Sequence, residues 1–166
     1  MRNSIRSIWE FELISRIGGG AVFGNGATYP LEGGFYYISP VNSPIYVYSL
    51  GFSSTGVPEF TLASQTSDTS TGLVGIGAPT ITTYKGQAGT AILWLVDPAA
   101  GLRAYYAVPQ NGKMVKIPTP PTNTVAKFQR PVFGNGRYYL TSASGDIYVG
   151  PGKRKALIRD KLLTVI

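Results

Sequence analysis

The sequence predicts an all-β protein whose short strands pair antiparallel, and three observations support this fold class. Runs of four to six β-branched and aromatic residues recur along the 166-residue chain, each bounded by Gly, Pro, Asn or Ser. Asn-Gly dipeptides stand at 25–26, 111–112 and 135–136, and this pair is favoured in tight hairpin turns because both residues tolerate a positive φ. No convincing helical pattern separates one run from the next.

Ten candidate strands follow from these runs. In chain order they span residues 35–38, 45–48, 60–63, 79–82, 92–95, 103–108, 114–117, 130–133, 138–141 and 147–149. Residues 64–72 are rich in Ser and Thr and are expected to form a loop, and residues 118–123 are a Pro-rich connection. Strand patterning resumes directly after both segments, so neither is expected to link two domains.

The two ends of the chain depart from this pattern and give a three-part organisation. Residues 1–17 are expected to be an N-terminal extension containing a short helix or an unpaired strand. Residues 18–152 form the β body, and residues 153–166 form a basic C-terminal tail. Apolar side chains in the tail interleave loosely with Arg and Lys, which is compatible with an amphipathic helix.

Composition removes several classes of enzyme. The chain has no Cys, which excludes a disulfide scaffold, an iron–sulfur site and a thiol nucleophile. It has no His, which excludes His-based triads and most zinc sites. We therefore assign no catalytic, cofactor-binding or metal-ligating residue and expect no cofactor.

The net charge of +7 lies largely in the C-terminal tail. Five basic side chains of residues 153–166 stand against Asp160 alone: Lys153, Arg154, Lys155, Arg159 and Lys161. A basic tail on a nearly neutral body argues against nucleic-acid binding, for which a basic fold surface is typical. The longest apolar run, residues 91–96, is far shorter than the about 20 residues that span a membrane, so no membrane span is expected.

Internal repetition indicates the architecture. The pentapeptide Val-Phe-Gly-Asn-Gly occurs at 22–26 and again at 132–136, which is 110 residues later. Aromatic strands come in pairs, and Tyr46, Tyr105 and Tyr148 of the second strands are 59 and then 43 residues apart. A period of about 50 residues holding four short strands is typical of a β-propeller blade. We therefore predict a partial β-propeller of about three four-stranded antiparallel blades, the best-formed unit having strands at 79–84, 92–96, 102–108 and 113–117.

Several motifs carry a resemblance to a known family. They are Gly77-Ala78-Pro79-Thr80, Ile92-Leu93-Trp94-Leu95-Val96-Asp97-Pro98, Gly101-Leu102-Arg103-Ala104-Tyr105, Lys127-Phe128-Gln129-Arg130-Pro131 and Ser144-Gly145-Asp146-Ile147-Tyr148. The first three together resemble a blade of a quinoprotein (PQQ-type) alcohol-dehydrogenase-like propeller, and the last two resemble the blade that follows. The likeness covers residues 18–150 and is nearest to the secreted fungal members of the family.

The resemblance implies a location and a problem of closure. It implies an extracellular or cell-surface protein, although Glu10 and Glu12 interrupt the apolar stretch that a signal peptide needs. Members of the family usually have eight blades, whereas this chain has room for about three. An open arc exposes the apolar faces of its end blades, so we expect either a fragment or a homo-oligomer that closes the propeller.

A non-catalytic structural or binding module with a carbohydrate or protein partner is the function we expect. The candidate ligand contacts are Trp94, Tyr105 and Tyr138, whose rings can stack on sugars, and Asp97, as a ligand at a blade rim. Two alternatives stand beside them: the rings pack between blades, and Asp97 opens a turn before Pro98. The alternative function is a fragment of a PQQ- and Ca²⁺-dependent oxidoreductase, whose cofactor residues have no matching positions in this sequence.

Overall fold

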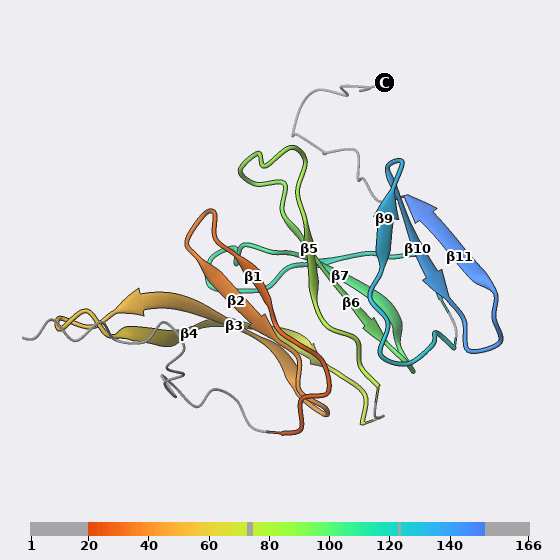
Figure 1. The fold of residues 1–166 in the computed structure, drawn as a ribbon, viewed down its shortest axis with the longest axis horizontal. Helices are drawn as coiled ribbons and strands as arrows, with labels where there is room; N and C mark the ends of the chain where they lie inside the picture. The colour runs from red at the N-terminus through yellow and green to blue at the C-terminus, as the bar shows by residue number, and fades with distance from the viewer. Residues whose placement is uncertain (1–19, 73–74, 123, 152–166) are drawn as a thin grey trace, which may run out of the picture.

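The computed structural model describes residues 20–72, 75–122 and 124–151, and these residues form three antiparallel sheets (Figure 1). The sheets have the strand orders β1-β2-β3-β4, β5-β6-β7-β8 and β9-β10-β11, so each is a meander in which successive strands pair. The strands are β1 (Ala27–Tyr29), β2 (Phe35–Ile38), β3 (Pro44–Phe52), β4 (Pro58–Thr69), β5 (Thr80–Thr82), β6 (Ile92–Asp97), β7 (Gly101–Tyr106), β8 (Lys116–Ile117), β9 (Val132–Gly134), β10 (Arg137–Thr141) and β11 (Ile147–Pro151).

The prediction of an all-β antiparallel fold is confirmed. All ten predicted strands have counterparts, from β2 to β11, and the predicted unit between residues 79 and 117 is the second sheet. The paired aromatic strands are the second and third strands of the three sheets, and Tyr46, Tyr105 and Tyr148 all lie on third strands. The strand β1 is not among the predicted strands.

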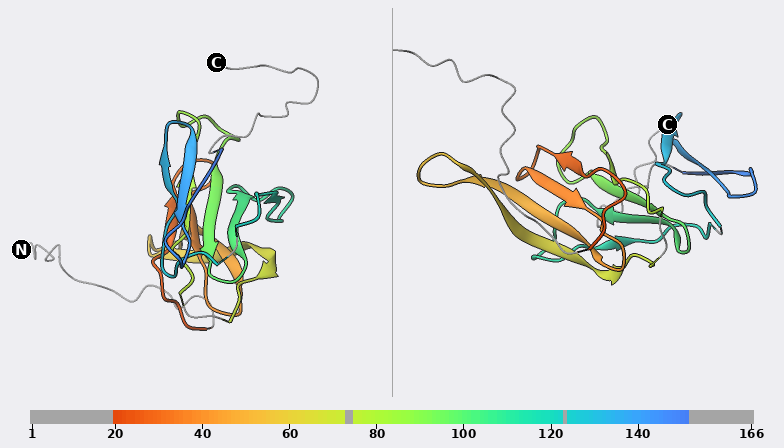
Figure 2. Two further views of the ribbon diagram at one scale, coloured as in Figure 1. Left: turned by 90° about the vertical axis from the view of Figure 1, so that its right-hand side faces the viewer. Right: turned by 60° about the horizontal axis from the view of Figure 1, so that its bottom comes forward.

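The middle sheet is buried on both faces because the other two sheets pack against it (Figures 1 and 2). Alternate residues of a strand point to opposite faces, so neighbouring residues of β6 and β7 belong to different clusters. Buried residues of the cluster shared with the first sheet include Tyr37, Val47, Leu93, Leu95 and Tyr105. Buried residues of the cluster shared with the third sheet include Trp94, Val96, Ala104, Tyr138 and Leu140.

The loop predicted at residues 64–72 is wrong for most of its length, because β4 continues to Thr69 and pairs with β3. The register between the two strands shifts beside Ile45, which disturbs the regular ladder. The Ile45 N–H donates instead to the buried Thr66 hydroxyl, at 2.9 Å. The Thr66 hydroxyl thus accepts a backbone hydrogen bond where the strand pairing is irregular. For this reason a Ser/Thr-rich segment, which is typical of loops, is extended here.

Two of the three Asn-Gly pairs form the predicted turns. Their φ angles are 51° and 75° at 111–112 and 49° and 69° at 135–136. The turn predicted at 25–26 is wrong, because neither residue has a positive φ and the pair precedes β1. Gly26 is required there for space, since a β-carbon at this position would collide with the ring of Tyr36. The two Val-Phe-Gly-Asn-Gly copies therefore do not occupy equivalent positions.

The described residues form an open stack of sheets without a closed ring. The N-terminal extension, with its predicted short helix or unpaired strand, lies outside the described residues, and so does the basic tail with its predicted amphipathic helix. Among the residues that the structure describes, no helix has the length and apolar character needed to cross a membrane.

Candidate functional site

A hollow lies at the end of the molecule where the chain enters the first strand of each sheet. Its volume is about 210 Å³, and it is lined by Phe23, Gly24, Asn25, Ile76, Ala78, Phe128 and Arg130. We call the three segments that line it the lead-in segments: 23–25 before β1, 76–78 before β5 and 128–130 before β9. They approach from the lower part of Figure 1, and the right panel of Figure 2 brings that end forward.

The lining residues occupy equivalent positions in the three sheets. Phe23, Ile76 and Phe128 each stand four residues before the start of β1, β5 and β9. Asn25, Ala78 and Arg130 each stand two residues before the same strands. Repeated units that stack regularly bring equivalent positions together, and the hollow is the place where they meet.

Glycine brings neighbouring lead-in segments into backbone contact. A β-carbon on Gly24 would lie 3.0 Å from the Ala78 nitrogen, and one on Gly77 would collide with the carbonyl oxygen of Gln129. Neither glycine has a positive φ, so close approach is what requires them. The equivalent position in the third segment is Gln129, whose Nε2 donates to the Thr141 carbonyl oxygen at 2.7 Å. The Gln129 side chain thus bonds within the third sheet.

Phe128 has a backbone conformation that bulky residues rarely adopt. Its φ of 58° lies in the left-handed region, which costs an L-residue about 1–2 kcal/mol. Its N–H donates to the Gly75 carbonyl oxygen at 2.7 Å, and Gly75 has no room for a β-carbon beside the Lys127 side chain. Phe128 is nevertheless 56% exposed. Strain combined with exposure of an apolar ring is typical of a functional position.

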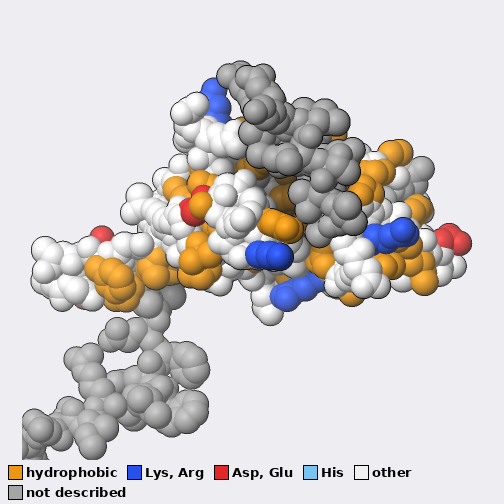
Figure 3. Space-filling model, turned by 90° about the horizontal axis from the view of Figure 1, so that it is seen from above, with side chains coloured by type: hydrophobic (Ala, Val, Ile, Leu, Met, Phe, Trp, Pro, Cys, Tyr) orange, Lys and Arg blue, Asp and Glu red, His pale blue; other side chains and the backbone are white. Residues whose placement is uncertain are grey.

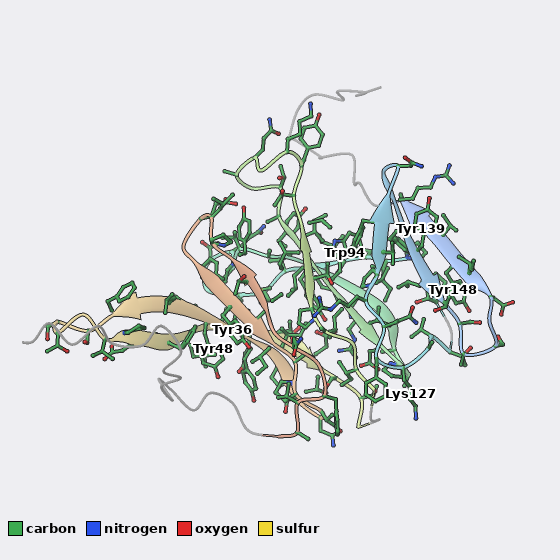
Figure 4. All side chains as sticks on the ribbon, viewed as in Figure 1. Tyr36, Tyr48, Trp94, Lys127, Tyr139 and Tyr148 are labelled. Carbon is green, nitrogen blue, oxygen red and sulfur yellow. The ribbon has the colours of Figure 1, made fainter. Side chains whose placement is uncertain are left out.

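The electrostatic character of the hollow is positive. Arg130 is the one charged side chain in its lining, and Asn25 supplies an amide. Arg130 belongs to none of the ion pairs formed within the described part of the chain. Lys127, labelled in Figure 4 at this end of the molecule, begins the turn that leads to Arg130. The hollow therefore has one cation in its lining and a mostly polar accessible surface, and the exposed residues Phe23 and Phe128 also contribute to the lining.

A separate charged network fastens the first sheet to the second. Asp97, at the end of β6, accepts hydrogen bonds from the hydroxyl and the N–H of Thr71, at 2.6 and 3.0 Å. Arg103 of β7 places Nη2 3.0 Å from Asp97 Oδ2 and donates from Nη1 to the Thr69 carbonyl oxygen at 2.8 Å. Asp97 and Arg103 belong to the middle sheet, whereas Thr69 ends β4 and Thr71 follows it, so the network joins the two sheets.

Asp68 of β4 extends this network toward solvent. Its carboxylate accepts a hydrogen bond from the Tyr105 hydroxyl at 2.8 Å and pairs with Lys116 Nζ at 2.7 Å. Both partners lie on the middle sheet, on β7 and β8. Burial raises the pKa of the Tyr105 hydroxyl above its ordinary value, and the hydrogen bond to Asp68 raises it further.

The two carboxylates of the network are held in the charged form. Burial by itself would raise the pKa of Asp97, but hydrogen bonds from Thr71, Ala99 and Ala100 outweigh it, and the pKa is lowered. Burial opposes the charge of Asp68 in the same way, and its bonds to Lys116 and Tyr105 lower its pKa. Carboxylates stabilised in this way are poor general bases, so the network serves to join sheets.

The structure places Asp97 wholly buried at the turn between β6 and β7. Its Oδ1 accepts the N–H groups of Ala99 and Ala100 at 3.0 and 3.2 Å, so the interpretation of Asp97 as a turn-opening residue is confirmed. Its role as a ligand residue stays a prediction. A ligand would have to displace Arg103 or Thr71 to reach the carboxylate.

The three predicted ring residues are buried between sheets. Trp94, labelled in Figure 4, is brought together with Tyr138 of the third sheet, with ring centroids 5.9 Å apart. Tyr105 lies in the other cluster, which faces the first sheet. Their packing role is confirmed, and their role as sugar contacts stays a prediction. None of the three lines the hollow.

The described residues do not fit the calcium–quinone centre of catalytic family members. Protein sites for Ca²⁺ supply about six to eight oxygen ligands, usually with several carboxylates. The lining of the hollow contains no carboxylate. Among the residues that the structure describes, no three His, Cys, Asp or Glu side chains gather, and Asp68 and Asp97 are already paired with cations.

The sequence contains a regular spacing that indicates the hollow, although the spacing of the tyrosines does not reveal it. Ile76 follows Phe23 by 53 residues, and Phe128 follows Ile76 by 52 residues. This spacing is more regular than that of the tyrosines, and Pro79 and Pro131 close the second and third segments at the same position. An apolar residue followed three residues later by Pro is a weak motif, however, and its meaning depends on the strand that follows it.

Comparison with protein-family models, with curated proteins and with solved structures found no match. The likeness to quinoprotein propellers therefore rests on the sequence motifs alone. The case for a function rests on the geometry of the hollow.

Replacing Gly77 by Ala tests the contact between lead-in segments. We expect Gly77→Ala to lower the free energy of unfolding by about 1–3 kcal/mol, because the added methyl group collides with the backbone at Gln129. Gly51→Ala is the matched control, since Gly51 also lacks a positive φ and has open space around it. Urea unfolding followed by circular dichroism measures both. Equal losses in the two variants would contradict the close approach.

Replacing Asp68 by Asn tests the charged network through its pH dependence. The folded pKa of Asp68 is below its ordinary value of 3.8, so the charge stabilises the fold above that value and loses its effect as pH falls through the folded pKa. The wild type should exceed Asp68→Asn in unfolding free energy by about 1 kcal/mol at pH 7, and the difference should shrink below about pH 4. Glu59→Gln, at an exposed position of β4, controls for the loss of one carboxylate. A difference that stays constant with pH would sink the assignment.

Proposed function

We propose that this chain is a non-catalytic binding module whose three sheets are consecutive blades of a quinoprotein-like β-propeller. The hollow lined by equivalent residues of the three lead-in segments is the observation that carries the proposal. Blades of a propeller surround a central channel, so segments that lead into equivalent first strands converge near the axis. A ligand bound there would contact all three sheets of the chain.

The size and lining of the hollow favour one group of a larger partner. Its volume of about 210 Å³ is below the roughly 300 Å³ at which pockets for drug-sized ligands begin. A single sugar ring or a single side chain fits this space. Phe23 and Phe128 are exposed and contribute to the lining, and the accessible surface of the hollow is mostly polar, which suits a sugar ring or a polar side chain. A carbohydrate or protein partner that presents one such group suits the site, and an extracellular or cell-surface location suits such a partner.

Closure by a homodimer completes the proposal. Propellers typically have about four to eight blades, so three sheets leave the ring open, whereas two copies supply enough for closure. Val132, Ile147 and Val149 are 64%, 67% and 48% exposed on the outer face of the third sheet. The outer face of the first sheet carries Phe60 and the exposed Leu62. Figure 3 shows apolar side chains at the surface over both end sheets. Stacking the third sheet of one copy on the first sheet of another would repeat the contacts seen within the chain.

Light scattering on the purified chain tests closure. We expect a dimer with a cooperative thermal transition, because the exposed end faces are removed from water when two copies stack. Val149→Lys should give a monomer, since it places a charge in that contact, whereas Ser54→Lys in the turn between β3 and β4 should leave the dimer intact. A wild-type monomer would overturn the dimer, and a monomer or aggregate without cooperative melting would indicate a fragment of a longer propeller.

Backbone amide spectra recorded by NMR test the binding site. Titrating the ¹⁵N-labelled chain with methyl glucoside, glucuronate and short blocked peptides should shift amides of residues 23–25, 76–78 and 128–130 for at least one probe. Phe23→Ser should abolish these shifts, whereas Phe52→Ser, which removes another exposed phenylalanine at the end of β3, should not. Shifts confined to other surfaces, or none with any probe, would contradict binding at the hollow.

A further inference from the structure

The third sheet has one strand fewer than the other two. The first and second sheets have four strands each, whereas the third ends at β11 among the described residues. Within the same part of the chain, β10 is the one strand that pairs with β11, and Figure 1 shows β11 at the margin of the molecule. The far edge of β11 is therefore the place where a further strand would continue the meander.

Burial distinguishes β11 from the third strands of the other two sheets. β7 is buried from Gly101 to Tyr105, and β3 is buried at Ile45, Val47 and Tyr48. Each of these strands lies between two neighbours. No residue of β11 is buried, and its apolar side chains Ile147 and Val149 are 67% and 48% exposed. The missing neighbour adds to the exposure that β11 already has on the outer face of its sheet.

The hairpin between β10 and β11 shows which backbone groups point to the open edge. The Ser142 N–H donates to the Asp146 carbonyl oxygen at 2.8 Å, and bonded and non-bonded residue pairs alternate along an antiparallel ladder. Thr141 and Ile147 therefore form a non-bonded pair, and Val149 lies in the next such pair. The N–H and C=O groups of Ile147 and Val149 thus point away from β10. Such a row of backbone groups is a template for the pairing of another strand.

The chain that follows β11 has the length and the composition to cover this edge. In the first two sheets the fourth strand comes directly after the third, across connections of five and nine residues, 53–57 and 107–115. Residues 162–166, Leu-Leu-Thr-Val-Ile, carry no charge, are typical of a strand and match the five residues of β11 in length. The ten residues between, 152–161, contain every basic side chain of the tail. Charged residues suit a connection that meets water, and apolar residues suit a strand.

We propose that residues 162–166 pair antiparallel with β11 and form the fourth strand of the third sheet. The basic tail then serves the fold, with residues 152–161 as its connection. Pairing takes place at the edge of the sheet, so the outer face with Val132, Ile147 and Val149 stays open to a second copy of the chain. The proposal rests on the described sheets and stands whether or not the hollow binds a ligand.

Amide hydrogen exchange measured by NMR on the full chain tests the pairing. The N–H groups of Ile147 and Val149 should be protected and should exchange about a hundredfold faster in Val165→Pro, because Pro cannot donate to a ladder. The N–H groups of Tyr148 and Gly150, which face β10, should stay protected in this variant and so show that the rest of the sheet is folded. Lys155→Pro, in the connection, is the matched control and should leave all four exchange rates unchanged.

A spin label identifies the segment that lies beside β11. The chain has no Cys, so Thr164→Cys provides a single site for a nitroxide label. The label should broaden the amide signals of residues 147–151 and leave those of the turn at 53–57 unchanged. In a mixture of spin-labelled ¹⁴N chain with unlabelled ¹⁵N chain, residues 147–151 should show no broadening, because the pairing lies within one chain.

Three results would overturn the proposal. Rapid exchange of Ile147 and Val149 in the full chain would mean that the edge is open, as a tail in the form of an amphipathic helix leaves it. Protection that survives Val165→Pro would assign the edge to a different segment. Broadening of residues 147–151 in the mixed sample would assign it to the tail of a second copy.

Discussion

Burial of the middle sheet on both faces is the constraint on which the rest of the structure depends. A four-stranded sheet of strands this short cannot form a core alone, so its apolar side chains need a partner on each side. β6 supplies Leu93 and Leu95 to one cluster and Trp94 and Val96 to the other, with no exposed residue between. The first and third sheets pack on opposite faces of the sheet that contains β6. This placement brings the lead-in segments together.

Charge and glycine refine the stack that apolar burial creates. Arg103 is a charged residue among apolar ones on the face toward the first sheet. Its pairing with the buried Asp97 is tolerated because Thr69 and Thr71 form further hydrogen bonds with the two side chains. At the other contact, Gly77 lets the second lead-in segment touch the backbone of the third. Without that approach, the equivalent positions in successive sheets would stand apart and the hollow would be wider and shallower.

The site and the stabilising network are therefore different parts of the molecule. Asp68 and Asp97, whose pKa values are lowered, lie between sheets and are hydrogen-bonded there. The first and third lead-in segments expose side chains at the hollow, whereas Ile76 and Ala78 of the second segment are buried. This division suits a binding module, because a ligand can bind at the surface without disturbing the buried ion pairs between the sheets. Trp94 and Tyr138, which the sequence suggests as ligand contacts, are found in the core instead. An aromatic ring indicates that a residue makes contacts, but its burial decides whether the partner is a ligand or another side chain.

The sequence by itself determined the fold class, ten of the strands and the four-strand unit, because alternation and turn residues are local properties. It also determined the Asn-Gly turns at 111–112 and 135–136, since positive φ is a property of those residues. Only the tertiary structure decided that residues 64–69 pair as strand, because the hydroxyl of Thr66 is useful only where the register shifts beside Ile45. Only it decided the site, because the regular spacing of the lead-in segments does not say which positions meet, and Asn25, Ala78 and Arg130 become neighbours only through the stacking of three sheets.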